Sequence, residues 1–392
     1  MSTSTSVPDL ATLYGKGKKE SPGLYVHIPF CRTKCPYCNF YSITDTSTVQ
    51  NYIDALKGEM ALYVDSTLTY DTIYVGGGTP SILTAEQLFE IFDTIMAVFS
   101  IAEGSEITIE ANPGDIDGDF ASFLVHSPVN RINVGVQSFS DDILAYLGRR
   151  HSAKKAISAL DRLIDEGCAN IGLDLIYGIP GQGIDLWKNT LAQALLFSPA
   201  HLSCYELTVE PETPLGMHLA QGDTPLPEED EMYDFFMTTT DILKCAGYVH
   251  YEVSNFASTE RFVSRHNRKY WSHTPYLGLG SAAHSFFGNM RWWNHRSVKR
   301  YIADAMNGRP PIESNETLDS DALIFEALFL GLRTAEGVDL YELNARFQVD
   351  LLKKNRSKIN ALYKNGFIEI ERGRIRPTDR GLAIADYIST FL

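Results

Sequence analysis

The sequence predicts an α/β protein built on a partial β/α barrel of six strand–helix units, open on one side, with a smaller α+β domain after it. Short apolar runs, rich in β-branched and aromatic residues, recur about every 35 residues over residues 23–207, as buried strands do. Segments with apolar residues at helical spacing separate these runs. Such alternation requires right-handed crossovers and a parallel sheet, although the periodicity alone also fits an open doubly wound sheet.

The individual elements follow from these patterns. Strands are expected over residues 24–30, 72–75, 106–110, 131–136, 171–176 and 201–207. Helices are expected over residues 49–64, 84–99, 141–147, 153–166 and 184–197, with a short helix after Asp115. Thr84 is a candidate N-cap for the second helix. Residues 1–22 are rich in Ser, Thr, Lys and Gly and lack the apolar core of a secretory signal, so a flexible tail is expected there.

Three cysteines, Cys31, Cys35 and Cys38, lie directly after the first expected strand with the spacing CxxxCxxC. Thiolates are soft ligands, and a tight loop of them suits an iron–sulfur cluster or zinc. Three ligands leave one iron of a [4Fe–4S] cluster without a protein ligand, which makes such a site a place for chemistry. A zinc site would need a fourth ligand such as His27, and plain buried thiols or disulfides are the remaining alternatives.

The composition is that of a globular protein, with 44% hydrophobic and 21% charged residues. No apolar stretch approaches the roughly 18 residues that a membrane-spanning helix needs. The formal charge of −15 argues against general nucleic-acid binding. Accessible thiolates persist in reducing compartments, so an intracellular, cytoplasmic location is expected.

Residues that commonly bind ligands follow the ends of the expected strands, where parallel barrels carry their functional groups. The triple glycine of residues 76–78 lets a ligand approach the backbone, and its N–H and C=O groups suit an amino acid, although a plain turn explains it equally well. Glu110 and Asp174 are candidates for accepting hydrogen bonds from ribose hydroxyls. Arg149 is a candidate for pairing with a carboxylate, and Gln137 lies at the same rim. Taken singly, each also fits a turn, a cap or an ion pair.

Between residues 208 and 307 this periodicity is lost, and we interpret the segment as an extension of the barrel. Five of the ten histidines lie between His250 and His295, together with three of the four tryptophans. This concentration suits a flat aromatic ligand with acidic edges, whose metal an imidazole would ligate. His266 is the preferred candidate for that role. Packing in a structural cap is the preferred interpretation for His273, His284 and His295.

Residues 308–316 are interpreted as a linker, and residues 317–392 as a winged-helix-like domain. Helices are expected over residues 319–332, 340–347 and 351–365, then a hairpin at 366–376 with its turn at Arg372-Gly373, then a last helix from Gly381. Residues 352–380 hold nine Lys/Arg against three Asp/Glu, which favours contact with phosphates. No run of base-reading side chains is evident, so a packing and lid role is preferred to DNA binding.

From Tyr25 to its C-terminus the chain resembles the coproporphyrinogen III oxidase-like branch of the radical S-adenosylmethionine (SAM) proteins. Residues 25–31 (YVHIPFC), 76–80 (GGGTP), 135–139 (GVQSF) and 174–180 (DLIYGIP) carry the resemblance, with the aromatic in CPYC at 35–38. Within that branch, residues 266–271 (HNRKYW) are similar to the HNxxYW signature of the HemW group of haem chaperones.

The resemblance implies a [4Fe–4S] cluster on the three cysteines, SAM on the open iron, and haem at His266. It implies SAM contacts from Tyr25, Gly77, Gly78, Thr79, Glu110, Gln137, Arg149 and Asp174. The implied function is transfer of haem to an acceptor protein, and the sequence identifies neither that acceptor nor an electron donor.

One position separates this chain from the oxidising enzymes of the branch. They carry a further cysteine, in a CxxxCxxCxC pattern, where this chain has Phe40, and the segment before its first strand is short. The HemW group shares both features, so a haem chaperone is expected. An oxygen-independent coproporphyrinogen III dehydrogenase is the first alternative, and a nucleic-acid-binding regulator acting through the C-terminal hairpin is the second.

Overall fold

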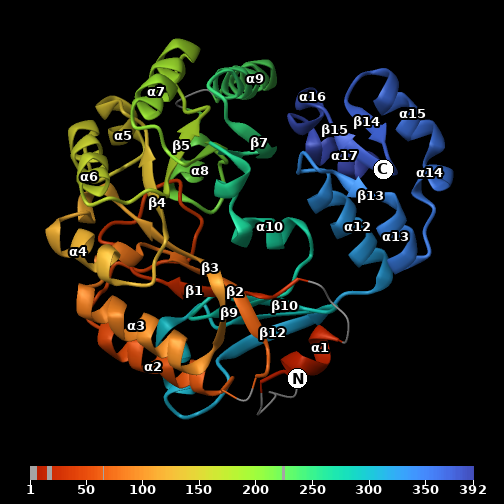
Figure 1. The fold of residues 1–392 in the computed structure, drawn as a ribbon. Helices are drawn as coiled ribbons and strands as arrows, with labels where there is room; N and C mark the ends of the chain where they lie inside the picture. The colour runs from red at the N-terminus through yellow and green to blue at the C-terminus, as the bar shows by residue number, and fades with distance from the viewer. Residues whose placement is uncertain (1–6, 16–19, 65, 223–225) are drawn as a thin grey trace. The chain divides into compact units, whose positions relative to one another are not determined.

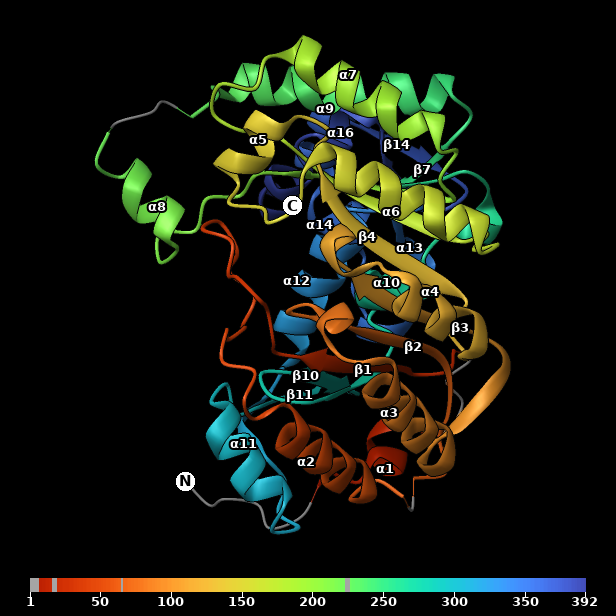
Figure 2. The same cartoon turned by 90° about the vertical axis from the view of Figure 1, so that its left-hand side faces the viewer.

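The computed structural model describes residues 7–15, 20–64, 66–222 and 226–392 (Figures 1 and 2). The chain divides into two compact units whose ranges interleave. The first unit comprises residues 1–173, 208–223 and 274–317, and the second comprises residues 174–207, 224–273 and 318–392. In the described residues, no helix is both long and apolar enough to span a membrane.

A single sheet forms the centre of the first unit. Its strands are β1 (Gly23–Ile28), β2 (Thr69–Gly77), β3 (Ser100–Ala111), β4 (Arg131–Gln137), β9 (Tyr276–Leu279), β10 (His284–Phe287), β11 (Met290–Asn294) and β12 (Ile312–Thr317). They lie in the order β12-β11-β10-β9-β1-β2-β3-β4. β1 pairs in parallel with both β2 and β9, and the pairs β2–β3 and β3–β4 are parallel as well. β9 to β12 are antiparallel.

Helices separate the parallel strands, as the sequence predicts. The helices of the first unit are α1 (Leu10–Tyr14), α2 (Val49–Ala61), α3 (Ala85–Val98), α4 (Gly118–His126), α5 (Asp141–Tyr146), α6 (Ala153–Asp165), α8 (Pro214–Leu219) and α11 (Val298–Ala305). Thr84 caps α3 in a capping box with Gln87, which confirms the predicted helix start. Figures 1 and 2 both show α2 and α3 along the same side of β1 and β2.

The buried carboxylate of Glu59 joins α2 to the antiparallel part of this sheet. It accepts hydrogen bonds from Tyr301 Oη (2.6 Å), the backbone N of Gly280 (2.7 Å) and Asn294 Nδ2 (2.6 Å). Burial raises its pKa to about 7. Because these donors come from α11, the turn after β9, and β11, one side chain fixes the position of three segments distant in sequence.

The second unit begins inside β5 (Ile171–Tyr177), which contains the boundary between the units. It continues with α7 (Ile184–Leu196), β6 (His201–Glu206), α9 (Glu229–Cys245), β7 (Val249–Glu252), β8 (Asn255–Ala257) and α10 (Arg265–Trp271). β8 pairs antiparallel with both β6 and β7. The strand–helix alternation therefore gives way to antiparallel pairing after β6, where the predicted periodicity ends.

The C-terminal part of the second unit combines helices with a small antiparallel sheet. Its elements are α12 (Ser320–Gly331), β13 (Val338–Asp339), α13 (Leu340–Phe347), α14 (Leu351–Lys354), α15 (Arg356–Lys364), β14 (Ile368–Glu371), β15 (Arg374–Pro377), α16 (Asp379–Leu382) and α17 (Ala385–Phe391). The sheet order is β13-β15-β14, and a core that includes Leu332, Ile375 and Ile388 lies beneath it. The predicted hairpin with its turn at Arg372-Gly373 is confirmed.

Two expected loop regions contain regular structure. Residues 308–316 were expected to be a linker, but β12 begins at Ile312 and pairs with β11, so that expectation is wrong. The expected tail, residues 1–22, lies partly outside the described residues. Within it, Asp9 caps α1 and Leu10 is buried, so this part of the range is ordered by packing.

Candidate functional site

The three cysteines lie in the first unit, in the loop that leaves β1. The loop is held by backbone bonds at both ends. Cys31 N donates to Ile43 O (3.0 Å), and Cys38 N donates to Cys35 O (3.1 Å). Between them, Pro36 O accepts from Leu215 N on α8 (2.9 Å). A hydrogen bond from α8, which is far away in sequence, therefore helps to fix the shape of the cysteine loop.

Cys38 lies close enough to Cys31 and Cys35 for their charges to act on its thiol. Burial raises the pKa of the Cys38 thiol, and the thiolates of Cys35 and Cys31 raise it further. Cys31 Sγ lies 3.3 Å from Thr79 Oγ1. In the described residues, no three His, Cys, Asp or Glu side chains converge closely enough to hold a single metal ion. The three cysteines are free thiols in one loop, and such a loop suits an iron–sulfur cluster.

His27, the conceivable fourth ligand of a zinc site, is engaged elsewhere. Its Nδ1 lies 2.9 Å from Tyr25 Oη, and its Nε2 lies 2.9 Å from the backbone O of Tyr41. Burial lowers its pKa to about 4, so the ring is neutral near pH 7. Both ring nitrogens have partners, so His27 is a bridge between β1 and the cysteine loop rather than a metal ligand.

The triple glycine brings β2 against the backbone that leads into the cysteine loop. Gly78 N donates to Ile28 O, and Thr79 N donates to Phe30 O, both at 2.8 Å. A Cβ on Gly78 would lie 2.7 Å from Phe30 O. Gly77 has φ +110°, and a Cβ there would lie 2.5 Å from the ring of His27. The sequence predicts that these glycines let a ligand approach the backbone. The structure shows that they also let the segment from His27 to Phe30 approach it.

Glu110, at the end of β3, is bound to this glycine turn. Its Oε1 accepts from Tyr74 Oη (2.7 Å), and its Oε2 accepts from Gly77 N (3.1 Å). Tyr74 in turn stacks on Tyr25, with ring centroids 6.2 Å apart. Tyr25, Gly77 and Glu110, predicted from separate segments, are therefore brought together over β1, β2 and β3.

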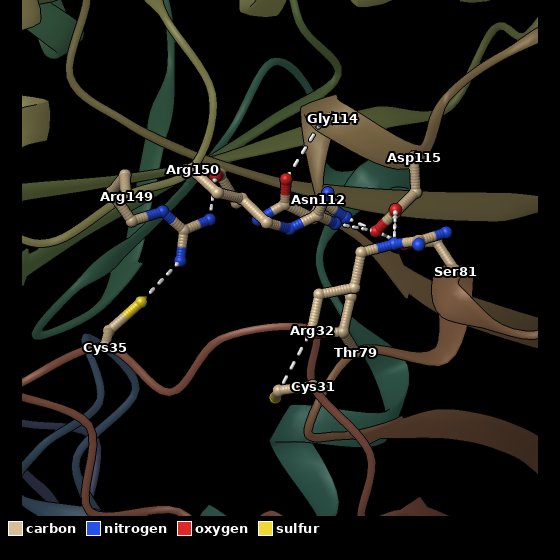
Figure 3. Close-up of polar contacts among 11 residues, drawn as sticks. Cys31, Arg32, Cys35, Thr79, Ser81, Asn112, Gly114, Asp115, Arg149 and Arg150 are labelled. Carbon is tan, nitrogen blue, oxygen red and sulfur yellow. Dashed lines mark hydrogen bonds and ion pairs between the residues drawn. The ribbon is translucent and has the colours of Figure 1, made fainter. Parts of the chain in front are cut away.

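Gln137 is the last residue of β4, and Arg149 follows α5 and points toward Cys35 (Figure 3). Arg149 Nη1 donates to Cys35 Sγ (3.5 Å), and its Nη2 donates to Gly135 O (2.7 Å). Burial opposes the charge of Arg149, but Tyr37 and Cys35 outweigh it and raise its pKa. Arg149 Nε and Gln137 Oε1 are buried and have no hydrogen-bond partner among the described residues. A free donor and a free acceptor of this kind suit a ligand with a carboxylate and an ammonium group.

Sequence reasoning missed Asp115, which anchors the cysteine loop (Figure 3). Its buried carboxylate binds Arg32 Nε at 3.2 Å and Arg150 Nη2, and it accepts from Ser81 Oγ at 3.1 Å. Arg32 lies between the first two cysteines, and Arg150 follows Arg149. The available signal was position, because Asp115 follows a strand end, as the predicted residues do.

Asp174 and His266 belong to the second unit. Asp174 lies on β5 and, after burial, raises the pKa of the Cys204 thiol. His266 lies on α10, is 1% exposed, and places its Nε2 2.9 Å from Tyr270 Oη. Burial lowers its pKa to about 3, with the Lys269 charge adding to the effect. As it stands, this imidazole does not present a nitrogen to an iron of haem.

Comparisons with known proteins agree with this arrangement. Residues 25–194 match the radical SAM superfamily, and residues 318–384 match the HemN C-terminal domain. The haem chaperone HemW of Lactococcus lactis is 34% identical over 93% of this chain and 95% of that protein. HemW of Bacillus subtilis is 34% identical over 93% of this chain and 97% of that protein. HemW of Escherichia coli is 37% identical over 82% of this chain and 85% of that protein. Coproporphyrinogen III oxidase (HemN) of E. coli shares the fold, with a TM-score of 0.81 at 23% identity over 97% of this chain and 92% of that one.

The fold and the cysteine loop define a radical SAM protein, a class that implies a [4Fe–4S] cluster and SAM. Within that class, identity above 30% over nearly the whole length decides the family. This chain belongs to the HemW family.

Proposed function

We propose that this protein is a haem chaperone, which binds haem and transfers it to an acceptor protein, and that it carries a [4Fe–4S] cluster with SAM. The observation that carries the proposal is the near full-length similarity to relatives named haem chaperone HemW. The thiols of the cluster require a reducing environment, which supports a cytoplasmic location.

Cys31, Cys35 and Cys38 hold the cluster in this proposal. A cluster with SAM on its open iron supplies one-electron chemistry at the end of the sheet. The CxxxCxxC spacing of the three cysteines, each a free thiol, supports this assignment. The Asp115 anchor and the hydrogen bond from Leu215 keep the loop in shape.

The SAM contacts in the first unit come from β1, from the ends of β2, β3 and β4, and from the turn after α5. Arg149 and Gln137 offer their unpartnered Nε and Oε1 to the amino-acid part of SAM. Glu110 accepts hydrogen bonds from ribose hydroxyls. The remaining contacts are the backbone and side chains of Tyr25, Gly77, Gly78 and Thr79.

The HNxxYW helix sets a requirement for haem binding. His266 is the ligand that the motif suggests, yet its Nε2 contacts Tyr270 Oη in a closed interior. Iron ligation by His266 therefore requires that this contact break and α10 open.

Phe40 occupies the position where the oxidising enzymes have a cysteine, and its side chain is exposed. A phenyl ring can neither ligate a metal nor transfer a proton.

The main alternative is a coproporphyrinogen III dehydrogenase, which the HemN-like fold favours. One experiment on anaerobically reconstituted protein distinguishes the two functions. Haem titration followed by Soret spectroscopy, then addition of apomyoglobin, should show binding and transfer. Coproporphyrinogen III with SAM and reductant should give no decarboxylated product. Turnover without haem binding would establish the dehydrogenase and refute the chaperone.

A further inference from the structure

The face of the sheet that carries Tyr25 continues onto the antiparallel strands. Directly paired residues in a sheet point to the same face, and so do residues two positions apart in one strand. Gly23 pairs with Tyr276, and Tyr276 pairs with Phe286. Gly23 and Tyr25 share a face, as do Phe286 and His284. His284 therefore lies on the face of Tyr25, within the same unit.

His284 presents an accessible imidazole on this face. Its side chain is exposed and stacks on the indole of Trp293, its directly paired residue on β11, with centroids 5.6 Å apart and an interplanar angle of 25°. Partial burial and then the charges of Arg291 and Arg296 lower its pKa, against the opposing effect of Glu316. The lowered pKa favours the neutral ring, the form that ligates metals.

The same face lies next to the cysteine loop. His284 is close enough to His27 to lower the pKa of that ring, after burial. The Arg296 guanidinium lies over the ring of Tyr41, 5.6 Å from its centroid. The Tyr41 carbonyl in turn contacts His27 Nε2 (2.9 Å). A ligand on His284 and Arg296 would therefore lie beside the candidate SAM site.

Other histidines of this unit are less suited to bind a metal-containing ligand. His151 is buried with Nε2 3.1 Å from Val136 O, and His295 is buried with Nε2 3.2 Å from Asp304 Oδ2. His126 is exposed on α4, where its Nδ1 lies 2.8 Å from Ser122 O. His284 combines access with an aromatic platform and a nearby cation.

These groups match the chemistry of haem. The indole stacked on His284 holds the plane of the imidazole, a neutral imidazole gives an axial ligand, and an arginine pairs with a propionate. Arg291 already pairs with Glu316 at 3.0 Å, so the exposed Arg296 is the better propionate partner.

Resting on the proposed haem-binding function, we propose that His284, rather than the buried His266, is the axial ligand of haem, with Trp293 holding the imidazole in place and Arg296 on a propionate. The proposal reverses the expectation for His284, which is interpreted from the sequence as a packing residue. It also leaves His266 as a structural residue of α10.

The test is a titration of the full-length protein with ferric haem, followed by Soret and visible spectra. The variants are His284→Ala, His284→Gln, His266→Ala and, as a matched exposed histidine, His126→Ala. We expect His284→Ala and His284→Gln to lose the histidine-ligated spectrum and to bind haem about tenfold more weakly or worse, and His126→Ala to match the wild type. Added imidazole should restore the ligated spectrum of His284→Ala. Metal-free protoporphyrin should bind the wild type and His284→Ala equally, because it has no iron to ligate.

The outcomes separate the two proposals. If the wild type binds no haem, the proposed function fails. If the wild type binds haem and both His284 variants keep its spectrum and affinity while His266→Ala loses them, the function stands and this inference is overturned. Arg296→Ala should weaken binding without moving the Soret maximum, and an unchanged affinity would remove Arg296 from the site.

Discussion

Nη1 of Arg149 donates a hydrogen bond to Sγ of Cys35 at 3.5 Å, while Nη2 of the same guanidinium donates to Gly135 O. One side chain thus contacts both the cysteine loop and the backbone of β4. Its Nε stays buried without a partner among the described residues, so the guanidinium has capacity for a ligand.

Arg149→Lys should weaken SAM binding about tenfold or more. Lysine keeps the charge but loses the planar fork, and a hydrogen bond to a charged group is worth about 1.5–3 kcal/mol. Isothermal titration with SAM on reconstituted protein measures the change, at matched iron content. Unchanged affinity would show that Arg149 serves Cys35 alone.

Replacing Cys31, Cys35 and Cys38 together by serine should abolish the cluster, because a hydroxyl is a poor ligand for iron in place of a thiolate. Iron and sulfide content and the EPR signal after anaerobic reconstitution are the measurements. Cys245→Ser, which removes an exposed thiol at the end of α9, is the matched control and should keep full content. Equal loss in both variants would contradict the assignment.

Asp115→Asn should lower both stability and cluster content. It leaves Arg150, 22% exposed, without its charged partner, which costs about 1–3 kcal/mol. Arg32→Ala should cost less than about 1 kcal/mol, because the Arg32 side chain is 60% exposed and solvent screens the pair. Urea unfolding and iron counts on both variants test whether Asp115→Asn has the larger effect. A larger effect of Arg32→Ala would refute this prediction.

Gly78→Ala should lower the melting temperature and the iron content. The added Cβ would meet Phe30 O at 2.7 Å and Ile28 O at 2.8 Å, so the turn must move away from the cysteine loop. Gly183→Ala is the control, because a Cβ there meets nothing within 4 Å. Gly→Ala at a compatible position reduces the entropy of the unfolded chain and should keep or raise the melting temperature, so similar losses in the two variants would contradict this contact as the cause.

Glu59 should make the protein less stable as the pH rises. Its folded pKa is about 7, against about 4.3 in an unfolded chain, so the folded state holds the extra proton between these values. The free energy of unfolding therefore falls from about pH 4.3 to about pH 7 and then levels off for this group. Glu59→Gln should make the free energy of unfolding depend less on pH. Some dependence should remain, because burial also raises the pKa of Glu252 to about 7. Urea midpoints from pH 5 to pH 8 test this, and parallel curves for the two proteins would contradict it.

Much of the fold was predictable because each parallel strand is a short apolar run next to a helix. β12 was not, because its residues follow two prolines, are mostly exposed, and pair with β11 alone, so they carry no apolar alternation. The same limit applies to α1, whose order depends on the burial of Leu10.

The candidate site was predictable where position alone decides it. The strand-end rule predicted that Gly77, Glu110 and Arg149 lie at one rim, and the structure adds that Gly77 contacts Glu110 and Arg149 contacts Cys35. It gave no sign that Asp115 binds two arginines, since both partners lie far away in sequence. Nor does the HNxxYW pattern reveal that His266 is enclosed, because burial depends on packing against the rest of the unit.

The position of β1 between β2 and β9 has a consequence for the nascent chain. A ribosome delivers β2 soon after β1, but β9 emerges only when most of the polypeptide has been made. Until then β1 offers an open edge to other polypeptides, which invites aggregation. Fragments that stop before residue 276 should therefore be aggregation-prone.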